Sequence, residues 1–378
     1  MGLIVTKQEE IDKYFESDAV SRSDLVSLLG GLDNFLAEKK KEEESTIYKE
    51  KRGIILGSAV DTILTGEEDA FSKKYYISQL DNKPSDVEMN IVRMVFDLVS
   101  EEENFNPETC PPLANHEWAI QEAIEYFNWQ ANWKLPTRIH KIIEKGSEYF
   151  MDLIKAFGKQ VLSQEEFFIV NDVVNSLRTN PRTKEYFDRQ SYARAENIDV
   201  YYQLPIYFTF RGLECKVLLD MVFVYKNPKT GLIESIKPVD LKTMSGNTID
   251  FPSHLRRFRY DIQSSFYTFA LTKRFQVFEK DIELRPFEFV VESVTNIGNP
   301  LVFKVSKNLS EIGRYGRKEM RSIDLNPKAV DNVFLSKEIK GFEQLLEDYL
   351  YYSNTGWKEE KVITENNGVL EIDWDGIK

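Results

Sequence analysis

Two residues of one short segment, Asp240 and Lys242, have types and a spacing that suit phosphodiester hydrolysis. On a β-strand, residues two apart project from the same face, about 6.6–7 Å apart along the chain. A carboxylate can hold a divalent cation that polarises a phosphoryl oxygen and lowers the pKa of a bound water. An amine beside it can position that water or screen the developing charge. The spacing therefore points to metal-assisted cleavage of a phosphodiester.

A second carboxylate, Asp220, lies within the apolar segment 217–223 that precedes this strand. The turn signal at 226–231 predicts antiparallel pairing, which would bring Asp220 near residues 237–240. A lone buried aspartate costs several kcal/mol of desolvation unless it is paired or binds a metal. Two interpretations remain open: Asp220 is a second metal ligand, or it forms a salt bridge with Lys242.

The next segment, residues 254–273, combines an apolar stripe with a polar one and is predicted to be one helix. The polar stripe consists of residues at helical spacing: Arg256, Arg259 or Tyr260, Gln263 and Tyr267. Such a stripe after an Asp-x-Lys strand can hold the scissile and neighbouring phosphates. It can equally be an ordinary solvated face, and the spacing does not decide between the two.

The runs GLECKVLLDMV, KPVDLKT and RYDIQSSFY, taken in order, resemble the nuclease core of the PD-(D/E)XK superfamily. The likeness is to RecE-like and lambda-exonuclease-like DNA exonucleases with RecB-type motifs. Their pattern is an aspartate in one strand, Asp-x-Lys-Thr in the next and Gln-x-x-x-Tyr in the following helix. This chain matches that pattern at five positions: Asp220, Asp240, Lys242, Gln263 and Tyr267.

The resemblance implies a role for each matched residue. Asp220, Asp240 and the backbone carbonyl of Leu241 would bind Mg²⁺, or Mn²⁺, and Lys242 would be the catalytic lysine. Gln263 and Tyr267 would shape the active site. Three further side chains are expected to bind the phosphates of DNA: Arg256, Arg259 and Ser23.

Weaker matches extend the likeness along the chain. Residues 21–25 resemble a Ser-x-Ser-x-Leu motif, and we expect Ser23 to cap a helix over residues 20–45. Residues 57–61 resemble a Gly-x-x-x-His helix, with Asp61 in place of the histidine. Because Mg²⁺ prefers oxygen ligands, Asp61 remains an expected ligand.

Three other positions complete the comparison with the family. Gln203 stands where a strand glutamate is common, and an amide cannot act as a base. Residues 289–292 resemble the strand that follows the Gln-x-x-x-Tyr helix, and residues 370–374 resemble a C-terminal tail of RecE-like nucleases.

The predicted fold class is α/β, a restriction-endonuclease-like core with a mixed central sheet flanked by helices, plus a large helical N-terminal part. Strand-like segments at 199–210, 215–225 and 232–243 predict a meander. No linker is evident, so we expect a single nuclease domain over 1–378. Its parts would be N-terminal helices (1–80), a helical insertion (81–195), the catalytic core (196–300) and a C-terminal extension (301–378).

Composition excludes several classes of protein. Two cysteines cannot supply a four-cysteine zinc or iron–sulfur site, and the absence of an HExxH motif argues against histidine-rich zinc hydrolysis. A net charge of −13 argues against a non-specific nucleic-acid coat protein, although a nuclease needs positive potential only along its groove. No apolar run reaches the roughly 18 residues of a membrane helix. We therefore expect a cytoplasmic protein with no membrane partner.

The function implied by the resemblance is a 5′→3′ exonuclease of phages or prophages. It would digest linear double-stranded DNA and leave single-stranded tails for recombination. The expected partners are DNA, a single-strand annealing protein and further copies of the chain in a trimer or tetramer. Two alternatives stay open: a same-fold nuclease acting on single strands or flaps, and a non-catalytic DNA-binding or assembly subunit.

Overall fold

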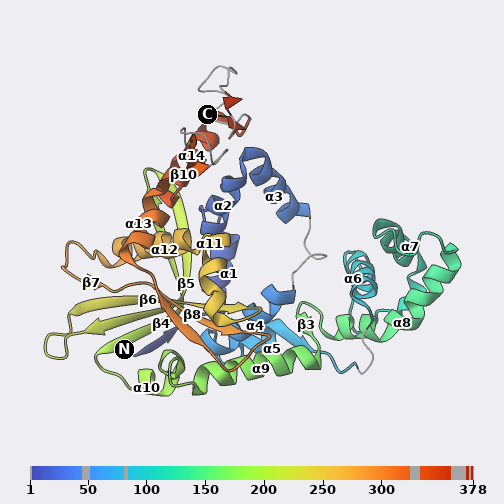
Figure 1. Ribbon diagram of the computed structural model, residues 1–378. Coiled ribbons are helices and arrows are strands. Elements are labelled where there is room, and N and C mark those ends of the chain that lie inside the picture. The colour runs from blue at the N-terminus through green and yellow to red at the C-terminus, as the bar shows by residue number, and fades with distance from the viewer. Residues whose placement is uncertain are drawn as a thin grey trace. The chain divides into compact units, whose positions relative to one another are not determined.

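The computed structural model describes residues 2–44, 52–80, 84–323, 333–358, 372–373 and 376–377. The chain divides into two compact units, one formed by 1–42 with 176–378 and one by 43–175 (Figure 1). Each unit has its own apolar core. Within the described ranges, no helix is long and apolar enough to cross a membrane.

A mixed seven-stranded sheet forms the centre of the first unit, in the order β1-β4-β5-β6-β8-β9, with β7 paired to β6. The strands are β1 (Leu3–Val5), β4 (Ile198–Phe210), β5 (Leu213–Lys226), β6 (Ile233–Met244), β7 (Glu283–Leu284), β8 (Glu288–Ser293) and β9 (Leu301–Lys304). Strands β4, β5 and β6 form an antiparallel meander, and β6 runs parallel to β8. The predicted mixed α/β architecture is therefore confirmed at this level.

Turn chemistry fixes the meander. Arg211 and Gly212 link β4 to β5 and both have positive φ, of 49° and 87°, as the tightest hairpin turns require. Between β5 and β6, Asn227 Oδ1 accepts hydrogen bonds from the backbone N–H groups of Lys229 and Thr230. Because both turns are short, the register of the three strands is well specified.

Helices cover both faces of this sheet and share its core with the strands. They are α1 (Gln8–Glu16), α2 (Arg22–Ser27), α3 (Leu32–Glu44), α10 (Arg189–Ala193), α11 (Phe251–Arg257), α12 (Tyr260–Phe275), α13 (Lys307–Tyr315) and α14 (Phe342–Thr355). Helix α12 connects β6 to the parallel β8 and buries Ile262 and Phe266 against the sheet. A hairpin of β10 (Arg317–Ile323) and β11 (Val333–Ile339) precedes α14.

The second unit is mainly helical. It contains α4 (Arg52–Thr65), α5 (Ala70–Lys74), α6 (Asp86–Ser100), α7 (Glu117–Tyr126) and α8 (Leu135–Lys155), and α9 (Gln164–Thr179) runs through its end at residue 175. Strands β2 (Tyr75–Ile77) and β3 (Gln160–Leu162) pair in parallel. This pairing joins residues 75–77 to residues 160–162 within the unit 43–175. The helical insertion expected over 81–195 stays a prediction.

Two predicted helices are interrupted. The helix expected over 20–45 breaks at Gly31, whose φ is 89°, and it is capped by Ser21 rather than by Ser23. The helix expected over 254–273 breaks at Arg259, which has a left-handed φ of 52°. The predicted tail motif at 370–374 lies largely outside the described residues, which include only Ile372 and Asp373 of it.

Candidate active site

The two strand aspartates lie where β5 and β6 separate. The last paired residues are Met221 and Val239, which are the chain neighbours of Asp220 and Asp240. Beyond that point Asp220 Oδ2 accepts a hydrogen bond of 2.8 Å from the backbone N–H of Leu241. The N–H and C=O groups of a strand residue point to the same side of the strand. The Leu241 carbonyl therefore also faces the gap between β5 and β6.

Asp240 is buried, with 2% of its surface exposed, and its two carboxylate oxygens have different surroundings. Oδ1 accepts a hydrogen bond of 2.6 Å from Gln263 Nε2. Oδ2 lies 2.5 Å from Lys242 Nζ and forms an ion pair with it. A carboxylate oxygen keeps further lone pairs beside one such contact, so Asp240 can also be a ligand for a cation.

The ion pair of Lys242 is therefore with Asp240, its neighbour on the strand. The sequence had left open a salt bridge between Lys242 and Asp220 instead. Burial alone would lower the pKa of Lys242, but the carboxylates of Asp240 and Asp220 outweigh it and raise that pKa above its ordinary value. All three groups thus lie close enough to interact electrostatically.

An aromatic ring holds the amine of Lys242 from the other side. Lys242 Nζ lies 5.1 Å from the centre of the Tyr260 ring, and the guanidinium of Arg22 lies 5.5 Å from the same centre. Tyr260 packs in turn against Phe251 and Phe289, at ring distances of 5.9 and 5.8 Å. Since Phe251 and Phe289 are buried, the position of Tyr260 is fixed by the core.

Arg22 is a candidate that the sequence did not reveal. It occupies the variable position of the Ser-x-Ser-x-Leu match, where residue type carries no signal. One terminal nitrogen donates to the carbonyl of Phe258, but the buried Nε has no hydrogen-bond partner. A buried donor without an acceptor is costly, so a ligand oxygen at this position would stabilise it.

Tyr267 and Gln203 border the same region. Burial raises the pKa of Tyr267 well above its ordinary value, and the charges of Asp240 and Asp220 add to the effect. Gln203 is buried and has a left-handed φ of 55°. Because the residues on either side of it pair with Leu219 and Met221, Gln203 lies opposite Asp220.

The predicted phosphate-binding residues lie elsewhere. Arg259 makes two hydrogen bonds of 2.9 Å to the carboxylate of Asp261 and a third, of 2.7 Å, to the carbonyl of Lys340. With Arg256 it lines a separate cavity. Ser23 is exposed, and its backbone carbonyl accepts a hydrogen bond from Ser27.

Asp61 belongs to the helical unit, where its Oδ1 accepts a hydrogen bond of 2.8 Å from Thr65. Its participation in the metal centre stays a prediction. Across the described ranges, no three side chains of His, Cys, Asp or Glu gather as a metal site. Within the sheet unit, a cation would therefore be held by Asp220, Asp240 and the Leu241 carbonyl, with the remaining ligands supplied by water or substrate.

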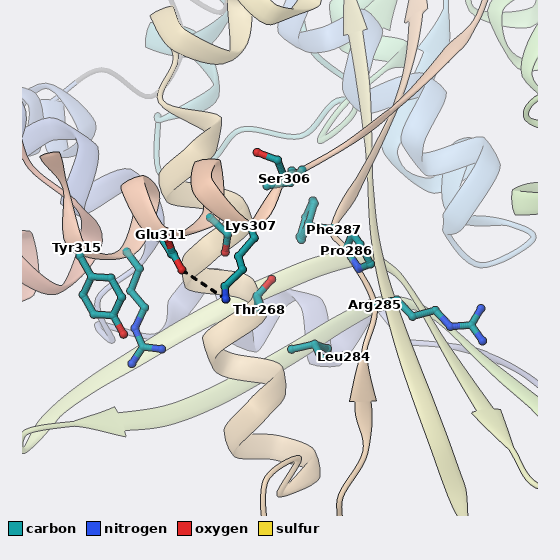
Figure 2. A pocket seen from close by; sticks show the side chains of 12 residues that line it. Thr268, Leu284, Arg285, Pro286, Phe287, Ser306, Lys307, Glu311 and Tyr315 are labelled. Carbon is teal, nitrogen blue, oxygen red and sulfur yellow. Dashed lines mark ion pairs between the residues drawn. The ribbon is translucent and has the colours of Figure 1, made fainter.

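A cavity of about 390 Å³ around the start of α13 is shown in Figure 2. None of the sequence-predicted site residues lines it. Lys307 and Glu311 lie 4.0 Å apart beside it, and Arg314 is paired with Glu343 at 2.6 Å. This cavity is therefore distinct from the candidate active site.

No known family model matches the sequence, and neither does any curated protein. Among solved structures, the chain is similar to one described as a "Putative exonuclease" from Eubacterium rectale. The sequence identity is 15% and the TM-score is 0.27, over 60% of this chain and 77% of the other.

Proposed function

We propose that this chain is a metal-dependent deoxyribonuclease with a PD-(D/E)XK core. The contacts of Asp240 are the main support for this proposal. This buried carboxylate is oriented by Gln263, paired with Lys242 and next to a second aspartate, Asp220. A purely structural ion pair does not need an adjacent second aspartate at a point where two strands separate.

The topology supports the same proposal. A three-stranded meander is followed by helix α12 and then by β8, which is parallel to the last strand of the meander. Asp240 and Lys242 lie beside Phe289 and Val291 of β8, on the face that packs with α11 and α12. This is the arrangement that the PD-(D/E)XK resemblance implies.

Each residue then has a defined task. A divalent cation, when bound, polarises the phosphoryl group and acidifies a water. Gln263 holds the Asp240 carboxylate in one orientation, and the Leu241 N–H does the same for Asp220. Lys242, kept in place by Tyr260, screens the charge that develops on the phosphate. Arg22 offers its unpaired Nε to a neighbouring phosphate oxygen.

The finer proposal follows from the family resemblance. The substrate would be linear double-stranded DNA digested 5′→3′, with single-stranded tails as products for recombination, and Mg²⁺ or Mn²⁺ as the cofactor. A ring of three or four copies and a single-strand annealing protein would be the partners. A closed ring would let a chain of net charge −13 hold DNA in a positively charged channel.

Digestion of linear duplexes labelled at the 5′ or the 3′ end tests this proposal. With Mg²⁺, early loss of the 5′ label and slow loss of the 3′ label is the expected result. Early loss of the 3′ label would reverse the polarity. No release of either label with Mg²⁺ or Mn²⁺ would favour a non-catalytic DNA-binding subunit.

A further inference from the structure

A cavity of about 530 Å³ opens beside α11 in the sheet unit. Its walls come from α11, β8, β9, α13, the first residue of β10 and the last residue of β11. The lining is apolar over much of its area, with these side chains: Phe251, Leu255, Phe303, Leu309 and Ile312. The volume lies within the range of about 300–1,000 Å³ that is typical of small-molecule sites.

The edge of this cavity is positively charged. Arg256 is exposed and pairs with no acidic side chain among the described residues. Lys304, at 71% side-chain exposure, is only loosely paired with Glu288 at 3.4 Å. The single acidic residue of the lining, Asp261, is neutralised by Arg259. The cavity therefore attracts anions, although the chain as a whole is acidic.

Only a few side chains separate the cavity from the candidate active site. Phe251 and Phe289 line the cavity and also pack against Tyr260. The ring of Tyr260 also contacts the amine of Lys242. The cavity and the candidate active site thus share the aromatic cluster around Tyr260.

We propose that this cavity binds the unpaired base of a single-stranded nucleotide that adjoins the cleaved bond, while Arg256 binds its phosphate. The inference rests on the proposed function and specifies which form of DNA the site takes. An apolar cavity of this size accommodates one base removed from its stack, as in enzymes that extrude a nucleotide. Contact of apolar walls with the base, combined with cations on the backbone, is how single strands are held.

Binding of short oligonucleotides without metal tests the inference. The probes are a single-stranded hexathymidylate and an abasic strand with the same number of phosphates, each carrying a fluorophore for anisotropy. The wild-type protein is expected to bind the thymidylate roughly tenfold more tightly than the abasic strand, which is the usual contribution of a bound base. Equal affinities would overturn the inference.

Two substitutions that fill the cavity, Asn308→Trp and Leu309→Trp, are expected to remove this preference. Asn308 is exposed at the rim, so its replacement leaves the core intact even if Leu309→Trp perturbs folding. Arg256→Gln should weaken the binding of both strands by a similar factor. The matched control is Arg257→Gln, which removes an exposed arginine of the same helix that does not line the cavity.

The result also separates this inference from the proposed hydrolysis. If the preference for thymidylate persists in both tryptophan variants, the base binds elsewhere and the inference fails. If an acidic, leucine-containing peptide displaces the thymidylate at lower concentrations than unlabelled thymidylate does, the cavity is a peptide site and the inference fails too. If the protein shows the predicted binding but digests no DNA, the assignment of the cavity stands and the proposed nuclease activity is refuted.

Discussion

Gln263 Nε2 donates a hydrogen bond of 2.6 Å to Asp240 Oδ1, and this contact ties helix α12 to strand β6 at the candidate active site. Both side chains are buried, so the amide has no competing water. The contact leaves the other oxygen of Asp240 facing Lys242. Gln263 therefore acts as a positioning residue for the carboxylate that would hold the cation.

Replacement of Gln263 by Ala is expected to lower nuclease activity by roughly 10- to 100-fold, the usual effect of removing a group that orients a metal ligand. The loss should be partly rescued by more Mg²⁺, because the affinity for the cation falls. Initial digestion rates over a range of Mg²⁺ concentrations measure this. Lys273→Gln, on the exposed end of the same helix, is the control. An unchanged Mg²⁺ dependence in Gln263→Ala would contradict the assigned role.

Tyr260 should act through its ring and not through its hydroxyl. Tyr260→Phe keeps the aromatic face that contacts Lys242 and Arg22, and its activity should stay within about twofold of wild type. Tyr260→Leu removes that face, and we expect a loss of roughly tenfold, since a partly desolvated cation–π contact contributes about 1–2 kcal/mol. The measurement is kcat/KM on duplex DNA. Equal losses in the two variants would assign the effect to the hydroxyl.

The capping box of α2 makes stability depend on pH. Burial alone would raise the pKa of Asp24, but hydrogen bonds from Lys39 and Ser21 outweigh it and hold the pKa below its ordinary value. A folded pKa below the unfolded one means that this stabilisation is complete above the unfolded pKa of about 3.9 and is lost as the pH falls through the folded pKa.

Asp24→Ala should therefore cost about 1 kcal/mol of unfolding free energy at pH 7. The difference from wild type should shrink as the pH falls below about 4. Urea unfolding at a series of pH values measures both. Asp33→Ala, at an exposed acidic residue in the first turn of α3, is the matched control and should show little change. A difference that stayed constant down to the lowest pH would show that the charge of Asp24 contributes nothing.

The two cysteines should differ in reactivity. Cys215 is buried in the core, and burial raises the pKa of its thiol to about 12. Cys110 is half-buried, and its pKa is raised as well, first by burial and then by Glu102. Because the thiolate is the reactive form, we expect a disulfide reagent at pH 8 to modify Cys110 slowly and to leave Cys215 unmodified until the protein unfolds. Rapid modification of native Cys110→Ser would contradict the buried position of Cys215.

The strands of the meander were predictable because their signals are local. Alternating apolar residues and the turn at 226–231 placed β5 and β6 within two residues of their observed bounds. The proximity of Asp240 and Lys242 followed from strand geometry alone. The contact of Asp240 with Gln263 was not predictable from local signals, since it depends on how helix α12 packs on strand β6.

The missed features depend on tertiary contacts. The left-handed conformation of Arg259 costs roughly 1–2 kcal/mol in a residue other than glycine. Its hydrogen bonds to Asp261 and the distant Lys340 carbonyl offset that cost. As a result, the polar stripe predicted along one helix is divided, and Arg256 and Arg259 line a cavity that Gln263 does not line.

The extent of the helical unit also depends on a tertiary contact. The parallel pairing of β2 with β3 joins residues 75–77 to residues 160–162. No local sequence pattern indicates a contact between such short strands. Arg22 was also missed, because its role depends on Tyr260, a residue that the fold alone brings to it.

The most direct test of the nuclease is a comparison of wild type, Asp240→Asn and Lys242→Met on end-labelled linear duplex with Mg²⁺, with folding checked by circular dichroism. Both substitutions nearly preserve side-chain volume, so loss of activity would report on the charges. The account predicts label release by wild type and a loss of at least about a hundredfold in each variant. Release at the wild-type rate by either folded variant, or no release by wild type, would contradict it.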